Sequence, residues 1–232
     1  EELIFEVYLS ISNKKLEIYL FDKKNLKNIY KEECNFKNDT HVIDYSLLND
    51  FLDKNIFKIE KLIGNFLKSI IIIIENNQIL NFSIGIKKKN YGEKINKHYL
   101  ESTLIELKDL FKENYQNNKI MHLIVNSYLI DGVNFTSFDQ EIEGDYICVE
   151  VNFISISNTL IKEISNVLEK YQIKIGHLLE KKYIKSLFEG ENLDLSLIAF
   201  KMQSGHNKNE IALVPKSLKK KGFFEKFFQL FS

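Results

Sequence analysis

The side chains that could carry out chemistry are few and scattered along the chain. Cys34 and Cys148 are isolated thiols, and the five histidines do not fall at a spacing typical of metal ligands. His122 and Asp131 could be proposed as an acid–base pair, but an isolated histidine in a predicted strand more often packs or hydrogen-bonds. The sequence has no Gly-x-Ser-x-Gly elbow, no His-Glu-x-x-His pair and no glycine-rich phosphate loop. We therefore expect no bound metal, no cofactor and no enzyme activity.

The amino-acid composition of the chain limits the kinds of molecule that it can bind. The chain has 232 residues, 44% of them hydrophobic, which is enough to fill a core in one large domain or two small ones. Its 32 basic residues, all lysine, balance 32 acidic ones, so no global field attracts nucleic acid. Two isolated thiols are typical of a reducing compartment. We expect a cytosolic protein that does not bind nucleic acid.

The first third of the chain alternates strands and helices. Residues 3–11, 15–21 and 28–36 have strand composition and should share one sheet. Apolar residues at helical spacing between 44 and 68 predict two helices or one interrupted helix. The run from Ile70 to Ile74 is much shorter than the roughly 20 residues that a membrane span needs, so it indicates a buried strand. We expect strands at 69–75 and 78–86 to form a hairpin through Asn76 and Asn77.

The rest of the chain continues the mixed order. The pattern predicts a helix over 96–112, strands over 119–126 and 145–156, and a helix over 158–171. A strand at 173–179 and helices at 181–188 and 193–203 follow. Gly205 and the single proline, Pro215, indicate that the compact body ends near residue 212. The fold class expected from this order is mixed α/β.

The last 17 residues, 216–232, form a segment of a different kind. At about 100° per residue its large apolar side chains share one arc, and four lysines stand just upstream of it. A buried Phe contributes roughly 1.5–3 kcal/mol, so this helix should anchor the chain in a membrane interface. The alternatives are a helix docked in the protein's own groove and an arm that binds a partner. The predicted membrane-binding residues are Lys216, Lys219, Lys220, Lys221, Phe223, Phe224, Phe227, Phe228, Leu230 and Phe231.

The middle of the chain resembles the FtsA family of bacterial cell division proteins. The stretch from Ile120 to Gly132 holds a strand and then Tyr128, Leu129, Ile130, Asp131 and Gly132, followed by Gly144 and the strand 146–156. In that family, a strand, a Tyr-x-hydrophobic-Asp-Gly turn and a second strand belong to an inserted subdomain called 1C. Residues 158–179 resemble the helix and strand that follow it.

The resemblance implies a domain plan. Residues 1–68 and 157–205 correspond to the actin-like subdomain 1A, and 69–156 to the inserted 1C subdomain, which is SHS2-like. Residues 206–215 would be a linker, and 216–232 resemble the family's amphipathic membrane-targeting helix. The implied fold is a partial actin-like 1A subdomain with an inserted 1C subdomain, in which the Asp-Gly turn joins the two 1C strands.

The chain departs from the family at both phosphate loops. Where the family has an acidic residue, a glycine and a lysine, this chain has Ser10, Ser12 and Lys15. A phosphate-binding hairpin needs glycine for close backbone approach and a carboxylate to organise the metal-bound water. The second loop, of Asp-x-Gly-Gly-Gly-Thr type, does not occur. We expect no nucleotide site.

The function implied by the resemblance is that of a non-catalytic adaptor of cell division. The tail would bind the inner face of the cytoplasmic membrane, which makes the protein peripheral. The turn of Tyr128, Asp131 and Gly132 in the 1C-like part would bind other division proteins, either FtsN-like or full-length FtsA-like, or a second copy of the chain. The alternative is a scaffold of a pilus or secretion assembly like PilM, which resembles FtsA in 1A and 1C but generally lacks the tail.

Overall fold

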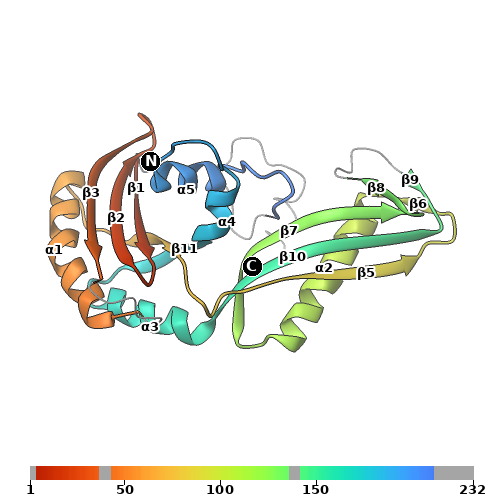
Figure 1. The fold of residues 1–232 in the computed structure, drawn as a ribbon, viewed down its shortest axis with the longest axis horizontal. Helices are drawn as coiled ribbons and strands as arrows, with labels where there is room; N and C mark the ends of the chain where they lie inside the picture. Colours follow the sequence, from red (N-terminus) through yellow and green to blue (C-terminus); the bar gives the residue numbers. More distant parts are fainter. Residues whose placement is uncertain (1–3, 37–42, 136–141, 212–232) are drawn as a thin grey trace. The chain divides into compact units, whose positions relative to one another are not determined.

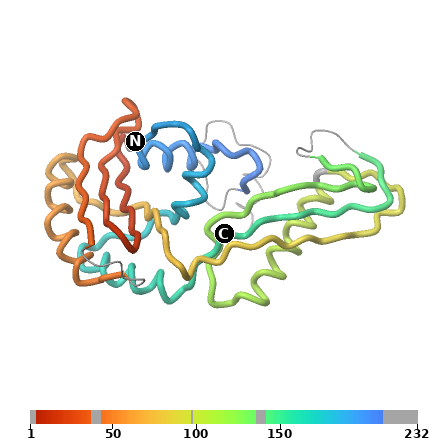
Figure 2. Tube along the Cα trace, viewed as in Figure 1, coloured from red at the N-terminus to blue at the C-terminus, as the bar shows by residue number. Residues whose placement is uncertain are grey.

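The protein divides into two compact units. The computed structural model describes residues 4–36, 43–135 and 142–211 (Figure 1). Of the described residues, unit 1 contains those up to Ile79 together with Asn158–His206, and unit 2 contains those from Leu80 to Ser157 and from Asn207 to Ile211. The trace in Figure 2 runs through three strands, a helix and a fourth strand of unit 1 before it enters unit 2.

Unit 1 is built on a five-stranded mixed sheet. Its strands are β1 (Phe5–Ile11), β2 (Lys15–Asp22), β3 (Lys27–Asn35), β4 (Ser69–Ile74) and β11 (Lys174–Glu180). Their order is β11-β4-β1-β2-β3. The first three strands run antiparallel, whereas β4 is parallel to both β1 and β11. Residues 7–11 of the central strand, β1, are all buried, because helices cover both faces of the sheet.

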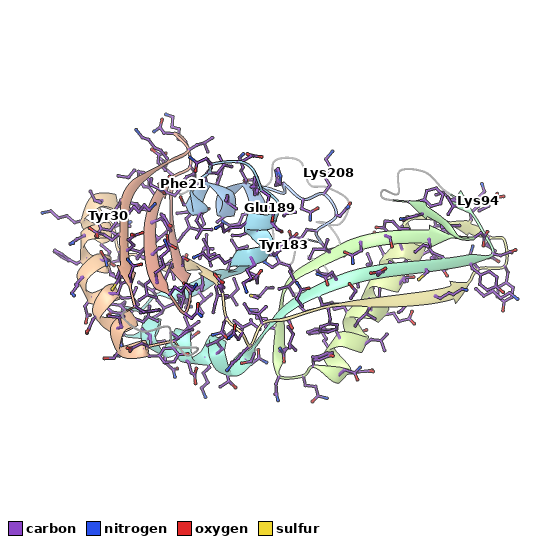
Figure 3. All side chains as sticks on the ribbon, viewed as in Figure 1. Phe21, Tyr30, Lys94, Tyr183, Glu189 and Lys208 are labelled. Carbon is purple, nitrogen blue, oxygen red and sulfur yellow. The ribbon has the colours of Figure 1, made fainter. Side chains whose placement is uncertain are left out.

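The helices of unit 1 are α1 (Tyr45–Ile63), α3 (Asn158–Glu169), α4 (Lys181–Ser186) and α5 (Leu195–Gln203). On one face of the sheet, the Tyr30 hydroxyl of β3 donates to Asn55 Oδ1 of α1 over 2.6 Å. On the other face, the Phe21 ring of β2 lies 5.4 Å from the Phe200 ring of α5 (Figure 3). The sheet is therefore sandwiched between α1 and the α4–α5 pair.

Local sequence sets the limits of α1. The Asp44 side chain accepts a hydrogen bond from the Leu47 amide and so caps the first turn. Gly64 ends the helix in the left-handed conformation at a φ of 67°. The region 44–68 therefore holds one continuous helix, whereas the sequence left open whether it held one or two.

Unit 2 is a four-stranded sheet with one long helix packed on it. The sheet order is β5-β10-β7-β8, made of β5 (Leu80–Lys89), β10 (Tyr146–Ser157), β7 (Asn118–Ile130) and β8 (Val133–Phe135). The helix α2 (Lys97–Asn114) contributes Phe111 to a stack of rings with Phe82 and Phe153 of the sheet. A short ribbon of β6 (Lys94–Ile95) and β9 (Ile142–Glu143) completes the unit.

The predicted hairpin through Asn76 and Asn77 is wrong. Strand β4 pairs with β1 and β11 in unit 1, whereas β5 pairs with β10 in unit 2. The isoleucine run is a buried strand as expected, with Ile70 and Ile72–Ile74 all buried, but it lies in the first sheet. The boundary placed between residues 68 and 69 is corrected accordingly, since the chain leaves unit 1 only after β4.

The predicted linker 206–215 is also corrected in its described part. The Ile211 amide donates to the Leu123 carbonyl over 2.8 Å, and the Val125 amide donates to the Asn209 carbonyl over 2.9 Å. Glu210 forms an antiparallel β-bridge with Ile124, and the Ile211 side chain belongs to the core of unit 2. Residues 207–211 therefore form a short edge segment on β7, which we call the edge strap. Ile211 buries apolar surface, and the backbone groups of the segment pair with groups at the edge of β7 that would otherwise be unpaired. These residues are therefore part of the folded unit and not a linker.

Within residues 4–36, 43–135 and 142–211, none of the helices is long and apolar enough to cross a bilayer.

A substitution at Gly144 tests the packing at the start of β10. A Cβ atom at this position would collide with Ile130 Cγ2 and come within 3.0 Å of Asp131 Oδ2. We expect Gly144→Ala to lower the free energy of unfolding by roughly 1–3 kcal/mol, measured by urea denaturation. The control is Gly85→Ala in the same sheet, where the new Cβ would meet only ordinary contacts from 3.8 Å. Equal stability of the two variants would contradict this packing.

Candidate functional site

The polar side chains of unit 1 converge at one edge of its sheet. The parallel strands β1, β4 and β11 end at Ile11, Ile74 and Glu180, and the β1–β2 hairpin turns at the same edge. Open α/β sheets usually bind ligands outside the carboxyl ends of parallel strands, so this edge is where a ligand site is expected. It is also where the altered first phosphate loop predicted from the sequence lies.

Ser12 takes up the backbone groups of that hairpin. Its hydroxyl oxygen accepts hydrogen bonds from the amides of Lys14, at 3.4 Å, and Lys15, at 3.2 Å. The hydroxyl in turn donates to the Lys15 carbonyl over 3.0 Å. Amides that a phosphate-binding hairpin would turn towards its ligand are therefore satisfied by the protein's own side chain.

A buried carboxylate, Glu17 of β2, lies behind the hairpin. Its Oε1 atom is 2.8 Å from Lys15 Nζ and accepts a 2.8 Å hydrogen bond from the Tyr19 hydroxyl. Its Oε2 atom is 3.1 Å from Lys181 Nζ and accepts a 3.3 Å hydrogen bond from the Ser10 hydroxyl. A carboxylate offers about four lone-pair positions, and these four donors fill them.

The electrostatics of this cluster favour a permanently ionised Glu17. Burial on its own would raise the pKa of the carboxyl, but hydrogen bonds from Lys15, Tyr19 and Lys181 outweigh burial and lower the pKa to about 2. Burial and the hydrogen bond to Glu17 raise the pKa of Tyr19 well above its usual value. A carboxylate that holds its charge so firmly is a poor general base near neutral pH, because it has little affinity for a proton.

We call Ser10, Lys15, Glu17, Tyr19 and Lys181 the Glu17 cluster. Sequence reasoning considered Ser10 and Lys15 but missed the other three. The only sequence signal was a charged residue, Glu17, inside an otherwise apolar strand. Its second ammonium partner, Lys181, is 164 residues away in the chain, so spacing could not reveal that pair.

The Tyr128, Asp131 and Gly132 turn lies in unit 2. Asp131 and Gly132, both with positive φ, connect β7 to β8, not β7 to β10 as predicted. The Asp131 carboxylate accepts hydrogen bonds from the amides of Asp145, at 3.0 Å, and Tyr146, at 2.8 Å, and so holds the start of β10. Tyr128 is buried in the core, and burial raises its pKa to about 12. Of the three residues, only Asp131 and Gly132 are exposed to a partner.

The other reactive side chains do not come together. His122 is fully buried and its Nδ1 atom lies 2.7 Å from Glu210 Oε1 of the edge strap, so it is paired with Glu210 and not with Asp131 as the sequence allowed. Cys34 lies in unit 1 and Cys148 in unit 2, and both are free thiols. In the described parts of the chain, no three His, Cys, Asp or Glu side chains are grouped so that they could hold a metal ion.

The predicted membrane-binding residues lie outside the described residues, which end at Ile211. These are Lys216, Lys219, Lys220, Lys221, Phe223, Phe224, Phe227, Phe228, Leu230 and Phe231.

Comparison with known proteins bears on the fold. No protein-family model and no curated protein sequence matches the chain. Among solved structures, one in a PilM–PilN type IV pilus biogenesis complex matches with a TM-score of 0.51 at 10% identity, over 79% of this chain and 50% of the other. The fold is actin-like. The expectation of a mixed α/β, partial actin-like fold is thus confirmed, and at this identity the likeness extends to the fold alone.

Two further structures match more distantly, and their TM-scores are too low to support an argument. One is the cytoplasmic domain of EpsL, an inner membrane component of the type II secretion system of Vibrio cholerae, with a TM-score of 0.40 at 11% identity over 78% of this chain and 58% of that one. The other is a Bacteroides thetaiotaomicron protein of actin-like ATPase fold and unknown function. It matches with a TM-score of 0.34 at 13% identity, over 79% of this chain and 55% of that one. This chain thus spans between half and three-fifths of these structures, and membership of the FtsA family in particular stays a prediction.

The Glu17 cluster predicts a specific dependence of stability on pH. The pKa of Glu17 is lower in the folded state than the ordinary 4.5, so its ionised form stabilises the fold above pH 4.5, and this contribution is lost as the pH falls towards 2. We expect Glu17→Gln to lower the free energy of unfolding by on the order of 3 kcal/mol at pH 7. The difference from the natural chain should shrink steadily between pH 4.5 and 2.

The measurement is urea denaturation across this pH range. Glu33→Gln is the matched control, because the Glu33 carboxylate is half exposed and lies 3.6 Å from the same Lys15 ammonium. Its effect should stay below about 1 kcal/mol at every pH. A Glu17→Gln penalty that does not change with pH would show that Glu17 stabilises the fold by packing alone.

Proposed function

We propose that this chain is a non-catalytic scaffold of the actin-like class that tethers assembly proteins to the inner face of the cytoplasmic membrane. The non-catalytic part of the proposal rests on the sheet edge of unit 1, where the polar groups are hydrogen-bonded to one another. Ser12 occupies the hairpin amides, and four donors of the protein occupy the Glu17 carboxylate. The Ser12 hydroxyl and the Glu17 carboxylate thus have internal hydrogen-bond partners, which supports a chain without a phosphate or metal site here.

The membrane attachment is supported by the sequence of the tail. Five phenylalanines within nine residues, Phe223 to Phe231, follow the lysines Lys219–Lys221. Apolar burial of such a face in the acyl–headgroup boundary, together with lysines near anionic headgroups, is the physical basis of an interfacial anchor. The chain reaches the tail from unit 2, because Ile211 is held on β7.

Two settings for such a scaffold have separate support. The tail and the Tyr128–Gly132 stretch favour an FtsA-like role in cell division, with FtsN-like or full-length FtsA-like proteins, or a second copy, as partners. Asp131 and Gly132 would then form an exposed contact in unit 2. The likeness to a structure from the PilM–PilN complex favours the second setting, a scaffold of a pilus or secretion assembly. Localisation of the protein in cells, at the septum or elsewhere on the membrane, separates the two.

Nucleotide binding tests the non-catalytic part of the proposal. We expect no saturable, magnesium-dependent binding of a fluorescent ATP analogue to the purified chain, because the hairpin and Glu17 are occupied by internal partners. Ser12→Gly, which frees the amides of Lys14 and Lys15, should not restore binding while Glu17 remains bound to Lys15 and Lys181. Micromolar affinity of the natural chain for the analogue would overturn this part.

Liposome co-sedimentation tests the anchor. We expect truncation after Pro215 to reduce binding strongly and to leave the unfolding midpoint unchanged. Phe224→Glu together with Phe228→Glu should have a similar effect, since the charges would lie in the middle of the apolar face. Changing Lys219, Lys220 and Lys221 to Gln should weaken binding only partly, and mainly on anionic vesicles, because charge is screened within about 8 Å at physiological salt whereas apolar burial is not.

The anchor hypothesis fails if truncation unfolds the protein, which would make the tail part of the core. It also fails if the variant with Glu at 224 and 228 sediments with lipid as well as the natural chain does.

A further inference from the structure

The outer side of α1 carries large apolar side chains that the fold does not use. The helix packs on the sheet through Leu48, Phe51, Leu52, Ile56 and Ile59, which are all buried. On its solvent side, Phe57 is 72% exposed and Leu62 is 53% exposed, and Phe66 in the loop after the helix is 80% exposed. Single exposed apolar residues are common on protein surfaces, but three within ten residues of α1 and the loop that follows it call for a physical reason.

The exposure of Phe66 is built into the loop and does not result from a frayed helix end. The Leu67 amide donates to Glu60 Oε1 over 3.0 Å, and the Asn65 amide donates to the Glu60 carbonyl over 3.3 Å. Leu67 itself is buried beneath the loop. These bonds fix the backbone on both sides of Phe66, so its ring is held outside the core.

The same surface is basic. Lys54, Lys58, Lys61 and Lys68 are all exposed, and none of them forms an ion pair among the described residues. The only carboxylate between residues 54 and 68 is Glu60, which is turned to the Leu67 amide. The turns of α1 before Lys54 carry Asp50 and Asp53, and Asp53 accepts a 2.6 Å hydrogen bond from the Tyr171 hydroxyl. The excess of positive charge is thus confined to residues 54–68, which hold four lysines and one carboxylate.

The lysines are spaced so that they repel one another. Lys54 and Lys58 are four residues apart and Lys58 and Lys61 are three apart, so they are neighbours on the helix surface. Like charges at this spacing destabilise a helix slightly. Phe57 lies between them, three residues after Lys54 and four before Lys61. The pattern costs stability and exposes apolar area, so folding does not explain it.

We propose that this surface, the α1 patch, is a second membrane-binding site that docks flat on an anionic bilayer. Phe57, Leu62 and Phe66 would enter the interface between headgroups and acyl chains, and the four lysines would contact headgroup phosphates. The composition favours lipid over protein, because protein interfaces are depleted of lysine whereas interfacial membrane sites combine lysine with phenylalanine and leucine. The site lies wholly within unit 1. It extends the proposed membrane attachment but does not depend on the tail.

The test uses the full chain and vesicles of phosphatidylcholine, with or without phosphatidylglycerol. We expect Phe57→Ser with Phe66→Ser to weaken partitioning about tenfold, because part of two Phe side chains is no longer buried. Lys54→Gln, Lys58→Gln and Lys61→Gln together should weaken it by at least about tenfold on vesicles that contain phosphatidylglycerol, and hardly at all on phosphatidylcholine alone. All these side chains are exposed, so the unfolding midpoint should stay close to that of the natural chain.

Control variants elsewhere on unit 1 show whether binding depends on the α1 patch itself or on exposed apolar and basic residues in general. Leu26→Ser with Ile29→Ser removes two exposed apolar side chains near β3, and Lys24→Gln with Lys27→Gln removes two exposed lysines there. Neither control should change partitioning. If a control weakens binding as much as the α1 patch variants do, or if the α1 patch variants bind as the natural chain does, the proposal is overturned.

A combination with the tail keeps the two membrane proposals distinguishable. The chain with Phe224→Glu and Phe228→Glu should retain weak binding that requires phosphatidylglycerol, and the added α1 patch changes should remove that remainder. Loss of all binding in the tail variant alone overturns the α1 patch and leaves the tail anchor intact. Unchanged binding in the tail variant, abolished by the α1 patch changes, overturns the tail anchor instead. If the α1 patch changes alter only self-association, seen by light scattering, the surface binds protein and the lipid proposal is wrong.

Discussion

The architecture of unit 1 depends on keeping one charged carboxylate inside an apolar sheet. Glu17 lies on β2, next to the fully buried central strand β1, and a buried carboxylate without partners costs several kcal/mol. Lys181, immediately after β11, supplies one of the compensating charges, and Lys15 in the hairpin supplies the other. The beginning of the chain and its returning segment must therefore both be in place before this charge is neutralised. The ion pair between Glu17 and Lys181 thus links the N-terminal strands to the segment of unit 1 that follows unit 2 in the sequence.

The same cluster is the structural basis of the proposed non-catalytic role. In a sheet of this kind, the carboxyl edge is a natural ligand site, because strand ends and loops converge there. Here Ser12 folds back on the hairpin amides, and Lys15 is drawn to Glu17. These polar groups thus have partners within the protein, and these bonds fix the edge of the sheet. This arrangement agrees with a scaffold, whose requirement is a stable surface.

Local patterns predicted the elements well, and long-range pairing caused the errors. Alternation and helical spacing located nearly every strand and helix, because amphipathic period depends only on nearby residues. The isoleucine run shows where prediction from local sequence fails. Its burial followed from its composition, but Asn76 and Asn77 suggested a hairpin, and only the parallel partners of β4 assign it to unit 1. Likewise, nothing in the sequence before Pro215 indicates that Glu210 bridges Ile124 or that Lys181 neutralises Glu17. The exposure of Phe57 and Phe66 also required the structure, since phenylalanine is usually buried.

The edge strap determines where mechanical tension from the C-terminus enters the protein. The segment runs antiparallel to β7 and is held there by Ile211 and Asn209, so a pull from beyond Ile211 reaches unit 2 before it reaches α5. A short strand pulled from its free end breaks its hydrogen bonds in turn, and five released residues add up to about 17 Å of slack. His122 would lose its contact with Glu210 at the second step. A pull from beyond Ile211 would thus detach the edge strap, and with it the Ile211 side chain from the core of unit 2, before it loads α5.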